Sequence, residues 1–294
     1  MPLESANVLM QKAVAGRYAV GYFESWNLES LQGVVDAAEA SRSPVIVGFG
    51  GEVLSRRGRL GEERLAWYAA LGKAAADSAS VPCGLILNEC SRADWVRQAV
   101  ALGFNLVMYT PATEDSRALT REIADFARYA HSHGVAVEAE LDTLPCGISA
   151  ELTEGSVTDP RRAAELVAAT GIDLLAVSVG NVHIALHGTQ ALDVDRIAAI
   201  RKAVTVPLVL HGGSGIEPDS LREAIAAGIA KVNFGTSMKL RYLSALRKTL
   251  DTRQKDPHRL LGHGGEEDLL VAGRLAVRDA VLEKMQVLGC CGKA

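Results

Sequence analysis

A histidine followed by a glycine-rich turn, His211-Gly-Gly-Ser-Gly215, combines two kinds of chemistry within five residues. The apolar run before it, residues 207–210, predicts a strand that ends at the histidine, where an imidazole can bind a metal or transfer a proton. A glycine turn at the start of a helix leaves backbone N–H groups available for a phosphate. The segment indicates a site that holds a phosphorylated small molecule beside a metal. A tight turn around a hydrogen-bonded core histidine is the alternative.

Three side chains from distant parts of the sequence are candidate metal ligands. His183 and His211 come first, because neutral imidazole is the commonest protein ligand for zinc-like ions. A catalytic site needs about three protein ligands and an open position. Glu89, which follows the apolar residues Leu85–Leu87, is the best third candidate, and a surface ion pair is its alternative. We therefore expect these three side chains to meet at one cation.

Two further carboxylates, Glu138 and Glu140, lie two residues apart in an apolar run. Alternation along a strand places both on the same face. One of them could ligate, neutralise or orient a metal site, and a buried charge network without a catalytic role is the alternative.

Two glycine-containing segments offer groups for a phosphate. They are Gly212–Gly215 and Asn233–Ser237, and Ser214, Thr236 and Ser237 add hydroxyl donors. Each segment is a weak motif alone. If they follow neighbouring strands, they form the kind of paired loop that often holds phosphate in α/β barrels.

The elements that must position these residues alternate between short apolar runs and longer amphipathic segments. The apolar runs are rich in Val, Ile and Leu, as expected for parallel strands covered on both faces. The expected strands are residues 18–23, 44–49, 82–87, 105–109, 136–141, 174–179, 207–210 and 231–234. The expected helices are residues 28–40, 62–79, 93–102, 117–133, 160–170, 194–203, 218–227 and 237–253, with a further helix over 267–288.

Eight strand–helix units in 294 residues predict an α/β fold, namely a single (β/α)8 TIM barrel with an additional C-terminal helix. An open, doubly wound sheet is the alternative. No linker or low-complexity tract marks a second domain, so we expect residues 1–294 to form one domain. Chemistry in such barrels gathers at the carboxyl ends of the strands. Polar residues stand at or just after most of these ends: Glu24, Asn88, Glu89, Tyr109, Glu138, Glu140, His183, His211 and Asn233.

The composition limits the classes of partner. Hydrophobic residues make up 48% of the chain and charged residues 22%, which suits a large core and a soluble surface. The formal net charge is -4 and no segment is dense in Lys or Arg, so nucleic acid is not an expected partner. The N-terminus lacks an apolar signal core, and no apolar run is long enough to cross a bilayer. We expect a cytoplasmic protein with no membrane partner.

Over nearly its whole length the sequence resembles the class II fructose-bisphosphate and tagatose-bisphosphate aldolases. The matching segments are residues 18–21, 27–29, 137–141, 158–160, 170–177, 208–215, 228–233 and 289–294, together with the stretch around His183. The resemblance implies a (β/α)8 barrel and a phosphorylated sugar substrate. It also implies a divalent metal, usually Zn²⁺ with Mn²⁺ or Co²⁺ as alternatives, and a homodimer or homotetramer.

The resemblance also implies roles for individual residues. His183 and His211 fall on two of the family's three zinc histidines, and Glu140 matches a glutamate beside the metal. Four residues match groups that bind the substrate phosphate and the dihydroxyacetone-phosphate moiety: Gly213, Ser214, Asn233 and Thr236.

The main departure from the family pattern is at the end of the third predicted strand. The family has Leu-Asp-His-Gly, in which the histidine is the first zinc ligand and the aspartate exchanges a proton with the C4 hydroxyl. This chain has Leu87-Asn88-Glu89-Cys90. Glutamate still offers a metal an oxygen ligand, but an asparagine amide cannot carry the proton. General acid–base help contributes about 10²–10⁴-fold, so the family's cleavage step should be weakened unless another group, such as Glu89, replaces the aspartate.

Three smaller departures accompany it. Glu24 stands where the family usually has asparagine, and Ile184 replaces the glycine after the second zinc histidine. Residues 142–155 do not match the family's Gly-Gly-x-Glu-Asp loop, which supplies another glutamate implicated in proton transfer. Neither Glu151 nor Glu154 can be equated with that glutamate by motif.

The leading hypothesis is a divergent member of this family, a metal-dependent lyase that forms or cleaves a C–C bond in a phosphorylated ketose. The metal would polarise the substrate carbonyl and stabilise an enediolate. Glu89 and Glu140 would be catalytic residues, and Asn88 would orient a hydroxyl group. One alternative is an isomerase or epimerase that uses the same enediolate. The other is a non-catalytic paralogue that binds a sugar phosphate.

Overall fold

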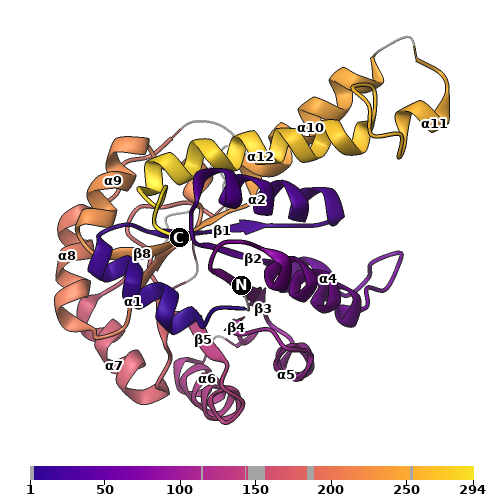
Figure 1. Cartoon of the computed structure of the whole chain (residues 1–294). Helices are drawn as coiled ribbons and strands as arrows, with labels where there is room; N and C mark the ends of the chain where they lie inside the picture. Colours follow the sequence, from indigo (N-terminus) through magenta and orange to yellow (C-terminus); the bar gives the residue numbers. More distant parts are fainter. Residues whose placement is uncertain (1–2, 114, 143, 145–155, 184–188, 252–253) are drawn as a thin grey trace.

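Eight parallel strands close into a barrel in the computed structural model, which describes residues 3–113, 115–142, 144, 156–183, 189–251 and 254–294. Each strand pairs with the next along the chain, and β8 pairs with β1 in parallel register, so the sheet has no edge (Figure 1). This closure confirms the predicted barrel and excludes the open sheet. The strands are β1 (Val20–Glu24), β2 (Val45–Gly50), β3 (Cys83–Cys90), β4 (Leu106–Tyr109), β5 (Ala136–Glu140), β6 (Leu174–Ala176), β7 (Leu208–Leu210) and β8 (Ile229–Phe234).

Helices surround the barrel, as expected for strands that are buried on both faces (Figure 1). They are α1 (Ala6–Gly16), α2 (Leu28–Ser41), α3 (Gly51–Ser55), α4 (Leu65–Ser78), α5 (Ala93–Leu102), α6 (Ser116–His131), α7 (Pro160–Thr170), α8 (Val194–Ala203), α9 (Pro218–Ala226), α10 (Thr236–Leu250), α11 (Pro257–Leu260) and α12 (Leu269–Leu288), with a 3-10 turn over Gly213–Gly215. The additional C-terminal helix is thus confirmed as α12. None of the helices in the described ranges is both long and apolar enough to cross a membrane.

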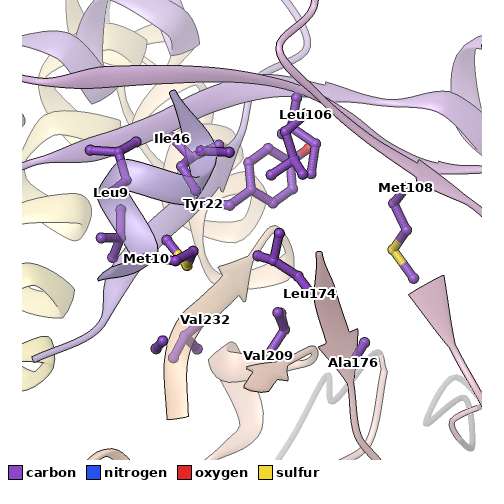
Figure 2. Packing of buried hydrophobic residues seen from close by; sticks show 14 of the residues in the cluster. Leu9, Met10, Tyr22, Ile46, Leu106, Met108, Leu174, Ala176, Val209 and Val232 are labelled. Atoms are coloured by element: carbon purple, nitrogen blue, oxygen red, sulfur yellow. The ribbon is translucent and has the colours of Figure 1, made fainter. Parts of the chain in front are cut away.

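Helix α1 is absent from the sequence prediction, and its packing explains why. Its sequence is largely apolar, with Asn7, Gln11 and Lys12 as the polar residues, and no side chain caps its start. Leu9 and Met10 are nonetheless fully buried, because α1 lies at the amino end of the strands, where the Glu4 N–H donates to the Cys83 carbonyl. Figure 2 shows both side chains in the core that also contains Val209 and Val232. The helix covers the end of the barrel opposite the polar strand tips.

Helix α12 packs against α2 and α10, so that a C-terminal helix contacts a helix from the N-terminal part of the chain. Arg274 of α12 donates two hydrogen bonds to the Asp36 carboxylate of α2, at 2.5 and 2.7 Å. The tail is held by backbone bonds from Gly292 and Ala294 to the carbonyls of Ser41 and Arg42. Together α10 and α12 extend beyond the barrel, with α11 near their far end (Figure 1).

The contact between α2 and α12 depends on a glycine. A Cβ atom at Gly33 would lie 2.6 Å from the Arg274 carbonyl oxygen, so Gly33→Ala should push the helices apart. We expect it to lower the free energy of unfolding by about 1–3 kcal/mol, although alanine is the better helix former. Gly61→Ala is the control, because its Cβ would meet no atom within 4 Å. Urea denaturation measures both, and equal midpoints for the two variants would contradict the packing argument.

Candidate active site

The carboxyl end of β3 carries Asn88 and Glu89, where the sequence departs from the pattern it resembles. The pairing of β3 with β4 shifts register between Leu87 and Cys90, which marks an irregularity in the strand. Within it Glu89 has a φ of 47°. This left-handed backbone costs a non-glycine residue about 1–3 kcal/mol and is found where the surroundings impose it, often at functional sites. Such irregularities re-aim a side chain, and here the carboxylate reaches two histidines.

The structure brings Glu89, His183 and His211 together. Glu89 Oε1 lies 2.7 Å from His211 Nδ1, and Glu89 Oε2 lies 3.0 Å from His183 Nε2. One possible ligand atom from each residue lies within 4.8 Å of the other two. The His211 side chain is buried, whereas that of His183 is 39% exposed, so the cluster is reached from the His183 side.

The chemistry of this cluster fits a divalent metal. Two imidazoles and one carboxylate form a donor set that suits zinc-like ions and leaves a position for substrate. A ligating histidine usually donates its other ring N–H to a carboxylate, which fixes the ring. His211 has such a partner, because its Nε2 lies 3.0 Å from Glu138 Oε1 while its Nδ1 faces Glu89.

Glu138 is itself held by a buried lysine. Lys231 Nζ donates to Glu138 Oε2 at 2.7 Å, and both side chains are fully buried. Burial alone would raise the pKa of Glu138, but Lys231 and His211 outweigh it and hold this pKa below its usual value. Burial lowers the pKa of Lys231, an effect that Glu138 opposes. Because each charge has a partner in the barrel interior, the pair can hold His211 in a fixed orientation.

The same lysine orients the amide of Asn88 through a second asparagine. Lys231 Nζ can only donate, and it donates to Asn233 Oδ1 at 2.7 Å. Asn233 therefore turns its Nδ2 outward, and this nitrogen donates to Asn88 Oδ1 at 3.2 Å. The remaining polar atom of the Asn88 side chain is its Nδ2, a hydrogen-bond donor, and Asn88 lines the pocket. Asn88 therefore presents a hydrogen-bond donor to the pocket, whereas an aspartate at this position would present an acceptor.

The charges of the cluster follow from its contacts. Hydrogen bonds from His183 and His211 hold the pKa of Glu89 well below its usual range, despite the burial that raises it. Burial lowers the pKa of His211, but its hydrogen bonds to Glu138 and Glu89 raise it overall to about 10. The pKa of His183 is raised by its hydrogen bond to Glu89. Without a metal, His211 thus holds a proton that a cation would have to displace.

A pocket opens beside the cluster at the carboxyl end of the barrel. Ser214, Asn233 and Thr236, three of the predicted phosphate-binding residues, line it. The loops after β7 and β8 meet there, because Ser214 Oγ lies 2.8 Å from Ser237 Oγ and accepts from the Ser237 N–H. The pocket is lined by Tyr22, Glu24, Gly50, Glu52, Val53, Asn88, Glu89, His183, Gly212, Ser214, Asn233, Phe234, Gly235, Thr236 and Lys239.

The fourth predicted phosphate residue, Gly213, lies behind this lining. It is buried, and a Cβ atom there would come within 2.7 Å of Val232 Cγ1 and 3.0 Å of the Asn233 carbonyl oxygen. Gly212 has a φ of 69°, and its Cβ would lie 1.9 Å from the Val182 carbonyl oxygen. These glycines let the β7 loop pack tightly against its neighbours, so that Ser214 reaches the pocket.

Glu140 occupies different surroundings from Glu138, although both stand on one face of β5. It lines a different pocket with Tyr109, Asp142 and Arg162, and it is not one of the three clustered ligands. Burial raises the pKa of Glu140 to about 7, against the lowering effect of the nearby His211. A carboxyl group with a pKa near neutrality is suited to proton transfer.

Some predicted positions lie outside the described residues, and some residues of the site were not predicted. Ile184, Glu151 and Glu154 belong to the first group. Lys231 and Lys239 belong to the second. A single lysine within the apolar run of β8 is a detectable sign, but its partner Glu138 lies 93 residues away. Lys239 stands in the first turn of α10, and in the sequence it cannot be distinguished from an ordinary lysine on a helix surface.

Comparison with known proteins agrees with the barrel. The family model described as class II fructose-bisphosphate aldolase matches residues 4–293. The chain belongs to the class II fructose-bisphosphate aldolase family. A fructose-bisphosphate aldolase of Geobacillus stearothermophilus is 33% identical over 297 residues, covering 100% of this chain and 99% of that protein. The crystal structure of the YdjI aldolase from Escherichia coli K12 superposes with a TM-score of 0.83 and 32% identity, covering 99% of both chains.

The class II aldolase family includes relatives named for different substrates. A sulfofructosephosphate aldolase of Alkalicoccus urumqiensis is 29% identical over 296 residues, covering 99% of this chain and 98% of that protein. The names of the relatives identify aldolases, which are lyases, and the family acts on phosphorylated sugars.

The buried pair predicts an asymmetric response to mutation. Lys231→Met leaves the Glu138 carboxylate buried without its cation, which should lower the free energy of unfolding by about 3–5 kcal/mol. Adding Glu138→Gln to Lys231→Met should restore part of that loss. Arg222→Met, which breaks an exposed ion pair with Asp219, is the control and should cost under about 1 kcal/mol. Guanidinium denaturation compares them, and a Lys231→Met loss no larger than the control would refute the pairing.

Proposed function

We propose that this class II aldolase is metal-dependent and forms or cleaves a C–C bond in a phosphorylated ketose through an enediolate. The observation that carries the proposal is the convergence of Glu89, His183 and His211 within 4.8 Å of one another, beside the loops after β7 and β8. A divalent cation there, most readily Zn²⁺ with Mn²⁺ or Co²⁺ as alternatives, would polarise the substrate carbonyl and stabilise the enediolate. Glu89 supplies the oxygen ligand that replaces the family's first histidine.

The remaining residues of the site bind and orient the substrate. Ser214 and Thr236 donate to the phosphate from the β7 and β8 loops, and Asn233 stands between those loops and Asn88. Gly213 gives the β7 loop its tight packing. Asn88 donates a hydrogen bond to a substrate oxygen and transfers no proton, because its amide is neutral.

We assign proton transfer to Glu140. It stands at the end of β5, next to the cluster but not within the set of three ligands, so it does not have to serve as ligand and base at once. Its pKa of about 7, raised by burial, suits both gain and loss of a proton near neutral pH. The family's aspartate is thereby replaced by a carboxylate from another strand.

An isomerase or epimerase is the second candidate, and Asn88 favours it. A reaction that stops at the enediolate and returns the proton needs no base at residue 88. Such an enzyme would use the same cluster and phosphate loops, and it would exchange or move substrate protons without releasing an aldehyde. Product analysis separates the two. A non-catalytic paralogue would bind the sugar phosphate and do neither.

Three broader features belong to the same proposal. Residues 1–294 form one domain, supported by a hydrophobic cluster of described residues that includes side chains from α1, the barrel and α12. The chain is a homodimer or homotetramer, supported by Leu240, Leu243 and Leu275, which are 48%, 45% and 39% exposed on α10 and α12. The cytoplasmic location stays a prediction from the sequence.

Metal uptake should depend on pH in a defined direction. In the metal-free protein the pKa of His211 is raised to about 10, so the cation must displace at least one proton at neutral pH. The apparent affinity for Zn²⁺ should therefore rise with pH, by about tenfold per unit for one proton, and level off near that pKa. Chelator competition at pH 6.5, 7.5 and 8.5 measures it. An affinity that stays constant over this range would contradict the assignment.

Ligand and base can be separated by two matched substitutions. Glu89→Gln should lose bound Zn²⁺ and also the exchange of dihydroxyacetone phosphate protons with D2O, the signature of enediolate formation. Glu140→Gln should keep the metal but slow the exchange by about 10²–10⁴-fold. Glu165→Gln, on the exposed face of α7, is the control and should change neither. Metal analysis and NMR supply the two measurements, and full exchange by Glu89→Gln would sink the metal assignment.

A further inference from the structure

The pocket at the carboxyl end of the barrel has two chemically different sides. The β7 and β8 side carries the hydroxyl groups of Ser214 and Thr236 and the start of α10. The β1 and β2 side carries two carboxylates, Glu24 and Glu52. A substrate that spans the pocket therefore meets donors at one end and negative charge at the other.

The Glu24 carboxylate is built into this second side. A Cβ atom at Gly50, the end of β2, would lie 2.9 Å from Glu24 Oε1, and one at Gly235, after β8, would lie 2.5 Å from Glu24 Oε2. Two glycines thus make room for the carboxylate between the ends of the neighbouring strands. Lys239 of α10 donates to Glu24 Oε2 at 2.7 Å and holds it there.

Positive charge is scarce around this end of the pocket. Of the Lys and Arg residues in the described ranges, Lys239 alone lines the pocket, and Glu24 already neutralises it. The two longer stretches outside those ranges, residues 145–155 and 184–188, contain neither Lys nor Arg. A phosphate placed at the β1 and β2 side would face Glu24 and Glu52 with no free cation from these parts of the chain.

The same side offers hydrogen bonds to neutral oxygens. The Tyr22 hydroxyl, two residues before Glu24 on β1, is buried at the pocket and has no hydrogen-bond partner among the described residues. Burial and the neighbouring carboxylates raise its pKa well above the usual value, so it remains a neutral donor. Carboxylates accept from sugar hydroxyls, and a phenol donates to them.

We propose, given the function proposed above, that the substrate is a ketose monophosphate. Its single phosphate is held by the β7 and β8 loops, and its opposite end is a neutral, hydroxyl-bearing chain. Glu24 disfavours a second phosphate at that end, because it occupies Lys239, the one cation among the described lining residues, and leaves the Glu52 carboxylate without a counter-charge there. The chain thereby differs from a bisphosphate aldolase in the charge of the substrate it accepts.

The test compares two sugars that differ only in the second phosphate. Fructose 1-phosphate and fructose 1,6-bisphosphate, and the two matching tagatose phosphates, are titrated into the zinc-loaded protein by calorimetry and assayed for cleavage. We expect the monophosphate to bind tighter by about tenfold, which is about 1.4 kcal/mol. This preference should weaken as salt screens the pocket charges.

The variants identify the group responsible. Glu24→Gln keeps the side-chain size, removes the charge and releases Lys239, so it should reduce the monophosphate preference to near unity. Glu165→Gln is the matched control on α7 and should leave the preference as in the unaltered protein.

Each outcome bears on one proposal. Tighter binding of the bisphosphate, or a monophosphate preference that Glu24→Gln leaves unchanged, overturns the inference. Because binding is measured without turnover, the charge preference is decided even if neither sugar is cleaved. If the unaltered protein does not exchange the protons of dihydroxyacetone phosphate with D2O, that result counts against the proposed function alone.

Discussion

The buried ion pair between Lys231 and Glu138 is the interaction on which the rest of the site depends. It places two opposite charges in the interior of the barrel, and each of them hydrogen-bonds a side chain nearer the carboxyl ends of the strands. Glu138 reaches His211, and through it Glu89. Lys231 reaches Asn233, and through it Asn88. The two neighbouring residues at the end of β3 are therefore positioned from opposite ends of a single network.

This network explains how a changed β3 tip can remain ordered. Asn88 and Glu89 alter both the charge and the hydrogen bonding of the position, yet each has a partner that the interior fixes in advance. Burying the two central charges costs free energy. The hydrogen bonds that connect them to residues of β3, β5 and β8 and to His211 after β7 offset this cost. The site thus gains its rigidity from the core and only its chemistry from the strand ends.

The sequence predicts the barrel and much of the site, because both leave local signs. Eight apolar runs separated by amphipathic segments indicate the strands, and the polar residues after them indicate the active end. The network is harder to predict. Lys231 and Glu138 are 93 residues apart, and a charged residue in an apolar strand does not reveal its partner. Glu138 and Glu140 share a face by alternation, but depth in the barrel makes one a core ion and the other a carboxyl group with a pKa near 7.

The left-handed backbone of Glu89 has a consequence for how such enzymes diversify. The bend at the end of β3 belongs to the main chain, so it aims whatever side chain stands there at the two imidazoles. Under the proposed function, histidine, glutamate or aspartate at this position would each offer the metal a ligand atom from the same place on the barrel. Under that function, the preference for harder or softer metal ions would then depend on residue 89, independently of the fold and of the loops after β7 and β8.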